Sequence, residues 1–223
     1  MNRTILILIT GLIFQGSMIS QNINYTIVDS ILLNDKSFEI DSLNGSHWTD
    51  LGFRYATPPD IHTPDEVLHR VQLEAVNGYN FIELVTRRDE SYEQIGQFIK
   101  HPMLKGKKYL LKLSTCHFPG FKGISTSGKK SSFAKPIMIR ITAYDFKSND
   151  VTRDSIDGIA PKLLIDSEVV NNTEWEEISF YFEPEYDCSF IAIQAFWDLP
   201  VLMAYNGHIL IDNLSNIYEI KDK

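Results

Sequence analysis

The sequence predicts an all-β fold, either two packed antiparallel sheets or a barrel. Apolar and polar residues alternate with a period of two through many short segments, which is the pattern of strands with one buried face. The alternating residues are largely β-branched or aromatic, and such side chains suit a pleated, half-buried surface. Gly, Pro, Asn and Asp separate the segments, and many short strands with such turns favour a sandwich or a barrel.

Several segments carry this alternation clearly. In Lys108–Cys116, the side chains of Tyr109, Leu111 and Leu113 fall on one face, while Lys112 falls on the other. Each such segment is expected to form a strand that turns its apolar face to a shared core. In chain order, the other segments are Asn80–Thr86, Tyr92–Ile99, Pro136–Phe146, Trp175–Phe182, Phe190–Trp197 and His208–Ile220.

Two segments between the expected strands have a different character. Pro64–Val76 favours one or two helical turns, with Thr63 as the N-cap before Pro64. Gly120–Lys135 is rich in Gly, Ser and Lys, and it is expected to form a long mobile loop. Long loops at one end of a sandwich often carry function, so this segment is also a candidate for binding.

Residues 1–20 have the order of a secretory signal peptide. Met1–Arg3 is basic, Thr4–Phe14 is an unbroken apolar run, and small or polar residues follow as far as Gln21. The apolar run is about half of the ~20 residues that a membrane-spanning helix needs. We therefore expect cleavage before Gln21 and export to the periplasm, the cell surface or the exterior. Residues 21–223 are expected to form a single sandwich domain.

The charge of the chain limits its partners. It carries 29 Asp and Glu residues against 21 Lys and Arg residues, which gives a net charge of −8. Nucleic acids and anionic membranes repel an acidic protein, so neither is an expected partner. No later segment is long and apolar enough to suggest a membrane span. The pattern indicates no particular oligomeric state.

The chain has two cysteines, Cys116 and Cys188. An even number in an exported chain permits a disulfide without demanding one. Each cysteine lies in or beside an expected strand, so the two either meet across the fold or stay free. A metal site made from these two thiols alone is not expected.

The C-terminal part resembles a known family. Tyr205–Asn213 reads Tyr-Asn-Gly-His-Ile-Leu-Ile-Asp-Asn and resembles the last strand of galactose-binding-like jelly rolls, the fold shared by many carbohydrate-binding modules. Ser37-Phe38-Glu39 is similar to their opening strand, and Trp48 falls where they often carry a tryptophan. The resemblance implies an antiparallel jelly-roll sandwich of two sheets.

Further stretches resemble a set of exported proteins of Bacteroidetes-type bacteria with this architecture, over about residues 37–220. The matching motifs include Thr57–Ile61, Gly96-Gln97 and Gly106–Tyr109, and an Arg- and Asp-rich turn before an aromatic-Glu pair. These proteins have a single arginine in that turn, whereas this chain has Arg87-Arg88, and either arginine is a candidate for the match. The resemblance implies the fold and leaves the ligand open.

The resemblance also implies a calcium site. In many galactose-binding-like domains, the opening Glu and the closing-strand Asp hold a structural Ca²⁺, and the matching residues here are Glu39 and Asp212. Calcium takes 6–8 oxygen ligands, so two carboxylates would need backbone carbonyls as well. The alternative is that Asp212 and Asn213 bond backbone groups at a strand end.

A glycan is the second candidate ligand. Sugar rings stack on aromatic side chains, while their hydroxyls pair with amide, carboxylate or guanidinium groups. The candidate platforms, at expected strand ends or in loops, are Trp48, Tyr55, Trp197 and Tyr205. The candidate polar contacts are Arg87, Arg88, Asp89 and Gln97. The alternative for each aromatic is a place in the core, which we expect outright for Trp175.

Catalytic signatures are missing from the sequence. Gly123–Lys130 has the G-x-x-x-x-G-K spacing, but a lysine stands where Ser or Thr should hold magnesium, and no helix is expected to follow. There is no HExxH or G-x-S-x-G motif, and the adjacent Cys116 and His117 point to opposite faces of a strand. For glycoside cleavage by paired carboxylates, the first candidates are Glu83, Asp89 and Glu93.

The sequence therefore predicts a non-catalytic exported module that binds a glycan or another cell-surface ligand. It is expected to need no cofactor, with structural calcium as the one candidate. The first alternative is a structural or adhesion component that binds another envelope protein. The second is a small polysaccharide-active enzyme.

Overall fold

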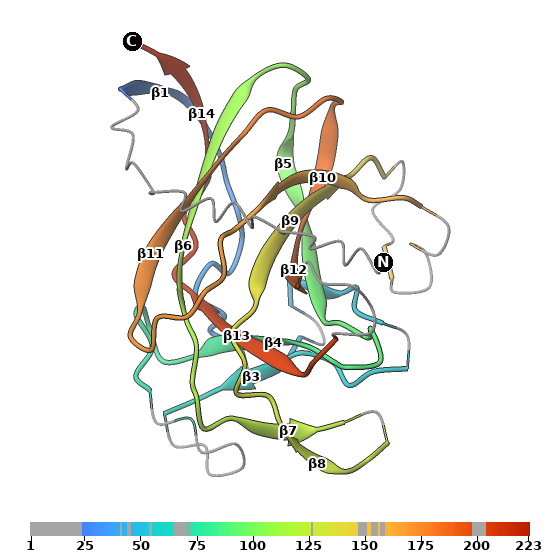
Figure 1. Ribbon diagram of the computed structural model, residues 1–223. Helices are drawn as coiled ribbons and strands as arrows, with labels where there is room; N and C mark the ends of the chain where they lie inside the picture. The colour runs from blue at the N-terminus through green and yellow to red at the C-terminus, as the bar shows by residue number, and fades with distance from the viewer. Residues whose placement is uncertain are drawn as a thin grey trace, which may run out of the picture.

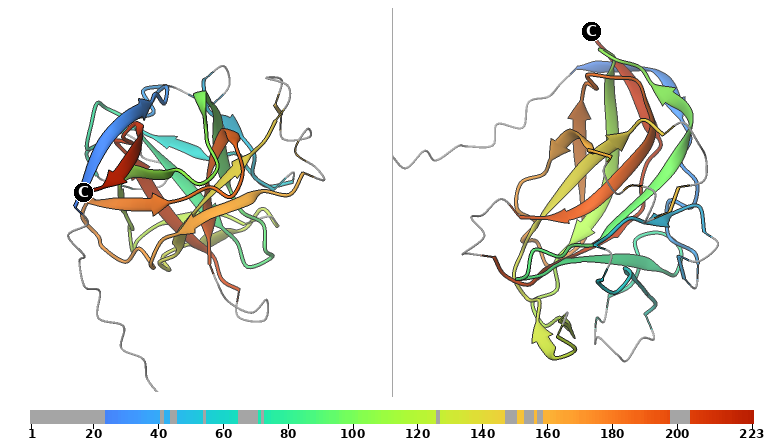
Figure 2. Two further views of the ribbon diagram at one scale, coloured as in Figure 1. Left: turned by 90° about the horizontal axis from the view of Figure 1, so that it is seen from above. Right: turned by 90° about the vertical axis from the view of Figure 1, so that its right-hand side faces the viewer.

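A computed structural model describes residues 24–40, 42–43, 46–53, 55–64, 71, 73–125, 127–146, 151–152, 156, 159–197 and 204–223. The expected signal peptide and much of the expected helical segment, residues 65–70 and 72, lie outside this description. Two antiparallel sheets pack face to face as a jelly-roll sandwich (Figures 1 and 2), which confirms the predicted fold class. Among the described residues, no helix is long and apolar enough to cross a membrane.

The sheets are built from strands that are distant in sequence. The seven-stranded sheet has the order β1 (Tyr25–Ile31), β14 (Ile217–Asp222), β6 (Lys108–Cys116), β13 (Gly207–Asp212), β4 (Phe81–Thr86) and β3 (Asp60–His62), and β11 (Glu176–Phe182) also pairs with β6. The five-stranded sheet has the order β10 (Lys162–Asp166), β9 (Met138–Tyr144), β12 (Cys188–Phe196), β5 (Gln94–Met103) and β2 (Thr49–Asp50). A separate hairpin pairs β7 (Lys122–Ile124) with β8 (Lys130–Ser132).

Two expected segments differ from the structure. His208–Ile220 divides into β13 and β14, because the chain turns at Asn213, whose φ is +51°, and Asn tolerates this left-handed region better than most residues. Gly120–Lys135 is not a loop throughout, since it contains the β7–β8 hairpin. Phe121 and Phe133 flank this hairpin, and both are buried. The burial of these two rings explains why a Gly-, Ser- and Lys-rich segment is ordered.

The apolar residues form a central core and two smaller outer cores. The alternating residues expected to face inward, such as Leu111 and Ile141, fill the central core between the sheets. The hairpin covers the outer face of the seven-stranded sheet, where Phe121 and Phe133 pack with Leu210. On the outer face of the five-stranded sheet, a third cluster forms around Phe190. Along part of the sandwich, apolar side chains therefore cover the outer face of each sheet as well as its inner face.

Both cysteines are free and buried. Cys116 ends β6, whereas Cys188 begins β12 opposite Met103. Leu104, the residue after Met103, donates its backbone N–H to the hydroxyl of Tyr109 at the start of β6, at 2.8 Å. Cys188 therefore lies beside the Tyr109 end of β6. Cys116 lies roughly 20 Å further along at the usual rise per residue. A disulfide needs Cα atoms within about 7 Å, so the bond considered from the sequence does not form.

Candidate functional site

The structure brings Glu39 and Asp212, the expected calcium pair, to one loop formed by residues 76–80. Oδ2 of Asp212 accepts the backbone N–H groups of Val76 and Asn77 at 2.7 and 2.9 Å. Oε1 of Glu39 accepts two more, from residues 79 and 80, at 2.7 and 2.9 Å. Gly78 lies between them with φ +83°, and a Cβ there would lie 2.2 Å from the Glu39 carboxylate. The two carboxylates therefore hold the loop through its backbone.

The hydrogen bonds of Asp212 account for its burial without an ion. The carboxylate oxygens of Asp212 face N–H groups, which carry positive partial charge and take the place of a cation. Burial raises the pKa of Asp212, and its hydrogen bonds to the backbone oppose that rise. The part of the chain that the structure describes contains no group of three or more His, Cys, Asp and Glu residues able to hold a metal. The arrangement matches the alternative in which Asp212 bonds backbone groups.

Chelation is accordingly expected to leave the melting temperature unchanged, because Oε1 of Glu39 and both oxygens of Asp212 already accept backbone N–H groups. Scanning fluorimetry with EDTA and with added calcium measures this. Asp212→Ala serves as the positive control and should lower the melting temperature, since it leaves the N–H groups of Val76 and Asn77 without this acceptor. A fall in EDTA that calcium reverses would show that the carboxylates rearrange around an ion.

Three candidate ligand contacts are buried, which corrects the expectation that they face a ligand. Trp48 lies in the core, and its Nε1–H donates to the backbone oxygen of Asp35 at 2.9 Å. The Gln97 amide accepts from and donates to the backbone of Asn34 at 3.0 and 3.1 Å. Arg87 is also buried. Each side chain has an internal hydrogen-bond partner, although Nε and Nη1 of Arg87 have none among the described residues, and all three stabilise the fold from within.

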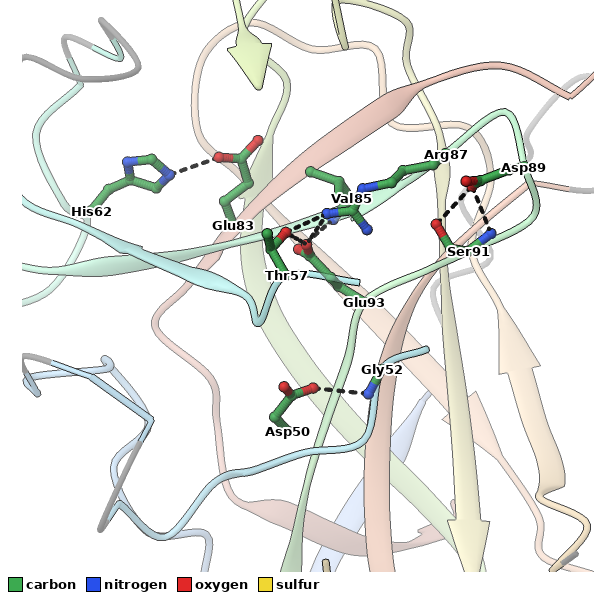
Figure 3. A network of polar contacts seen from close by, with 10 residues as sticks. All are labelled: Asp50, Gly52, Thr57, His62, Glu83, Val85, Arg87, Asp89, Ser91 and Glu93. Carbon is green, nitrogen blue, oxygen red and sulfur yellow. Dashed lines mark hydrogen bonds and ion pairs between the residues drawn. The ribbon is translucent and has the colours of Figure 1, made fainter. Parts of the chain in front are cut away.

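Arg87 belongs to a buried polar network (Figure 3). Its Nη2 lies 2.6 Å from Oε1 of Glu93, and both side chains are only 3% exposed. The same nitrogen donates to the hydroxyl of Thr57 at 2.6 Å, while Oε2 of Glu93 accepts the backbone N–H of Val85 at 3.1 Å. Burial raises the pKa of Glu93 well above its ordinary value, and the Arg87 charge opposes the rise. The network ties the turn after β4 to the start of β5.

The carboxylates first considered for glycoside cleavage are all engaged within the fold. Glu83 lies 2.7 Å from Nε2 of His62, and both are buried, while Glu93 pairs with Arg87. Asp89 is exposed and accepts the Ser91 hydroxyl at 2.8 Å (Figure 3). Glu83 is thus hydrogen-bonded to a buried histidine and Glu93 is paired with Arg87, and no open pair of carboxylates arises from these three residues.

Other candidates gather at one end of the sandwich. The backbone N–H of Arg88 donates to Oδ1 of Asn206 at 2.9 Å, which links the turn after β4 to the start of β13. The neighbouring Tyr205 is half-buried, donates its hydroxyl to Pro136 at 2.8 Å and lies under the Lys135 ammonium at 4.6 Å. Asp89 follows Arg88 directly. Trp197 follows the end of β12 and packs half-buried against the central core.

Tyr55 is the most exposed of these aromatics, at 81%. Its ring makes an edge-to-face contact with Phe53, with ring centres 6.2 Å apart, and Phe53 is exposed as well. The backbone N–H of Phe53 donates to the oxygen of Tyr92 at 2.9 Å, beside the start of β5. An exposed aromatic pair therefore lies at one margin of the five-stranded sheet.

The outer face of that sheet carries a polar row that the sequence did not indicate. Gln194 is directly opposite both Gln94 and Arg140, and Arg140 is opposite Asp166. The guanidinium of Arg140 binds Asp166 through Nε and Nη2 at 2.7 and 2.8 Å. It also lies flat on the ring of Phe196, 3.4 Å from the ring centre. We call Arg140, Asp166, Gln194 and Phe196 the Arg140 face.

The Arg140 face is accessible. Arg140 and Asp166 are 27% and 26% exposed, and Gln194 and Phe196 are also partly exposed. Arg140, Gln194 and Phe196 are ordinary members of alternating segments, Asp166 lies in a strand that the sequence pattern did not single out, and only the strand register aligns them. The sequence contained one hint, since polar residues recur on the face of β9 that points away from the core.

No protein-family profile matches the chain, and no curated protein matches it. Solved structures with a similar chain course include two from xylanases. One, from Clostridium thermocellum, is a two-module fragment of xylanase 10B with xylohexaose, at 12% identity and TM-score 0.46, where the match covers 88% of this chain and 30% of that one. The other, from Paenibacillus barcinonensis, is a xylan-binding domain at 15% identity and TM-score 0.47, covering 89% and 99%.

A third similar structure is a family 6 carbohydrate-binding module of a laminarinase from Zobellia galactanivorans, at 7% identity and TM-score 0.38. That match covers 77% of this chain and 99% of the module. The chain thus spans under a third of the first of these structures and nearly all of the other two. None of these likenesses assigns the chain to a family.

Proposed function

We propose that the protein is a non-catalytic module that binds a glycan on the Arg140 face. The observation that supports this most directly is the planar guanidinium of Arg140, held flat by Phe196 and fixed in its plane by Asp166. Such a group presents N–H donors in a fixed orientation and loses little freedom when it binds an acceptor. Gln194 adds an amide beside it. Amide, carboxylate and guanidinium groups together match the donors and acceptors of sugar hydroxyls.

The margins of the face support an extended ligand. The row from β5 to β10 crosses four adjacent strands, which at the usual strand spacing is about 14 Å. Phe53 and Tyr55 lie at its β5 margin, where exposed rings can stack on sugars. Arg88, Asp89, Trp197 and Tyr205 are proposed as further contacts at the adjoining end of the sandwich. With residues 1–20 as a signal peptide, residues 21–223 would act as one module outside the inner membrane.

Arg140→Ala is expected to weaken polysaccharide binding by about tenfold or more, because hydrogen bonds to a charged donor contribute about 1.5–3 kcal/mol. Titration calorimetry would measure this on the polysaccharide that binds best in a panel of plant, algal and host glycans. The matched control is Tyr186→Ala, which removes an exposed ring under the Lys162 ammonium at 4.1 Å. The proposal fails if Arg140→Ala binds as wild type, or if the Tyr186 variant loses as much affinity.

The alternative function is an adhesion component that binds another envelope protein. One observation favours it: β1 is an outer strand of the seven-stranded sheet, and Ile27 and Val28 on it are exposed. Exposed apolar residues on such a strand suit the addition of a partner strand. If no glycan in the same panel binds, the result would favour adhesion to a protein over glycan binding at the Arg140 face.

A further inference from the structure

A long internal stretch of this acidic chain contains only basic charges. From Gln94 to Tyr144 there is no Asp or Glu, while ten of the 21 Lys and Arg residues fall there. The net charge of the whole chain is −8, so positive charge is concentrated in the middle of the sequence. The fold distributes these residues over β5 to β9 and the β7–β8 hairpin.

Several of these cations have acidic partners from later strands. Lys107 lies 3.0 Å from Glu219, and Lys112 lies 2.7 Å from Glu177. Lys108 pairs with Asp222, and Arg140 pairs with Asp166. None of the remaining six lysines of this stretch has an ion-pair partner among the described residues. Three of these six lie together on the hairpin: Lys122, Lys129 and Lys130.

Lys122 and Lys130 share one face of the hairpin, and Lys129 is exposed in the turn before β8. Lys122 is opposite Ser132 and Ile124 is opposite Lys130, and residues two apart on a strand share a face. The other face of the hairpin points inward, since a Cβ on Gly123 would lie 3.2 Å from the rings of Phe121 and Phe133. Lys122 and Lys130 are diagonal neighbours, roughly 7–8 Å apart by the usual geometry, where like charges repel.

The base of the hairpin is fixed to the sandwich. Nε2 of His208 accepts the backbone N–H of Phe118 at 3.0 Å, and its Nδ1–H donates to the oxygen of Phe133 at 2.9 Å. His117 reaches the oxygen of Ala134 at 2.8 Å. The hairpin projects past the end of the sandwich in Figures 1 and 2. Unpaired lysines are thus carried on a rigid projection, which reduces the entropy that binding would cost.

We propose that the β7–β8 hairpin binds an anionic polysaccharide that carries sulfate or carboxylate groups. Lysine ammonium groups bind such anions as point charges, with three donors each. An extended polyanion contacts only the hairpin, whereas a flat anionic membrane would also approach the acidic remainder of the molecule and be repelled. This site is separate from the Arg140 face, where the cation is already neutralised by Asp166, and it does not depend on the function proposed for that face.

Dextran sulfate and uncharged dextran provide a matched pair of probes. Purified protein is expected to bind dextran sulfate in low salt, to lose affinity as salt rises, and not to bind dextran. The triple variant Lys122→Gln, Lys129→Gln, Lys130→Gln should weaken binding by about tenfold or more, because three exposed ion pairs are lost together. The control variant Lys100→Gln, Lys105→Gln, Lys221→Gln changes the net charge equally, at exposed positions outside the hairpin, and should bind as wild type.

Four outcomes would overturn the proposal. The first is that dextran sulfate does not bind, and the second is that salt does not change its affinity. The third is that both triple variants lose affinity equally, which would indicate an effect of net charge alone. The fourth is that vesicles of phosphatidylcholine and phosphatidylserine in equal parts bind in place of dextran sulfate, which would make a membrane the partner. Arg140→Ala should keep its dextran sulfate affinity, so failure of the Arg140 face and failure of the hairpin site give different results.

Discussion

Replacing Arg87 by methionine is expected to lower the free energy of unfolding by about 3–5 kcal/mol, because it leaves the Glu93 carboxylate buried without its cation. Burial already raises the pKa of Glu93, and Arg87 is the main opposing influence. Without Arg87, the carboxylate must either stay charged in the interior or take up a proton, and both are costly at neutral pH. Urea denaturation followed by tryptophan fluorescence measures the change.

Arg88→Met is the matched control, since it removes the adjacent arginine, which is exposed. We expect that variant to change the free energy by less than about 0.5 kcal/mol. The double variant Arg87→Met, Glu93→Gln should recover part of the loss, because no buried charge is left unpaired. Equal effects of the two single arginine variants would contradict the network.

A second large effect is expected on acidification. His208 is buried, and its pKa is lowered from 6.5 to about 3, first by burial and further by the nearby His117 and His62. Between these two values the unfolded chain takes up a proton at this residue and the folded chain does not. The contribution of neutral His208 is therefore complete above about pH 6.5 and is lost progressively as the pH falls toward about 3.

Between pH 6.5 and 4.5, His208 should account for a loss of roughly 2–3 kcal/mol in the free energy of unfolding. His208→Gln keeps a donor and an acceptor but removes the titration, so the gap between wild type and this variant should narrow over that range. Urea denaturation at several pH values measures it. His101→Gln, at an exposed position, should retain the wild-type dependence. A pH-independent gap between wild type and His208→Gln would contradict this role.

The fold was predictable from the sequence because alternation reports directly on which side chains are buried. Leu111 and Ile141 fall on the expected inward faces. The hairpin was missed because Gly, Ser and Lys dominate its composition, although Phe121 and Phe133 at its two ends were a signal of ordered structure. Alternation also holds no information on strand order. For this reason Arg140, Asp166 and Gln194 gave no sign that they would meet.

The resemblance pointed to residues that shape the fold more than to a ligand site. Thr57 accepts a hydrogen bond from Arg87, so two of the segments that carry the resemblance meet inside the fold. A Cβ on Gly96 would lie 2.2 Å from the Phe190 ring, and one on Gly207 would lie 2.3 Å from Ile137. Close packing and buried partners restrict the residue types that fit at such positions, and sequence analysis cannot distinguish this restriction from contacts to a ligand.

The positions of the two thiols allow local and global opening of the molecule to be told apart. Cys116 lies beneath the β7–β8 hairpin, while Cys188 lies in the central core. Burial raises the pKa of Cys116 to about 12 and also raises that of Cys188, so neither is reactive until it is uncovered. A small alkylating reagent would reach Cys116 when the hairpin lifts and Cys188 only when the sheets part. The wild-type chain thus carries two native reporters of unfolding, one for each layer.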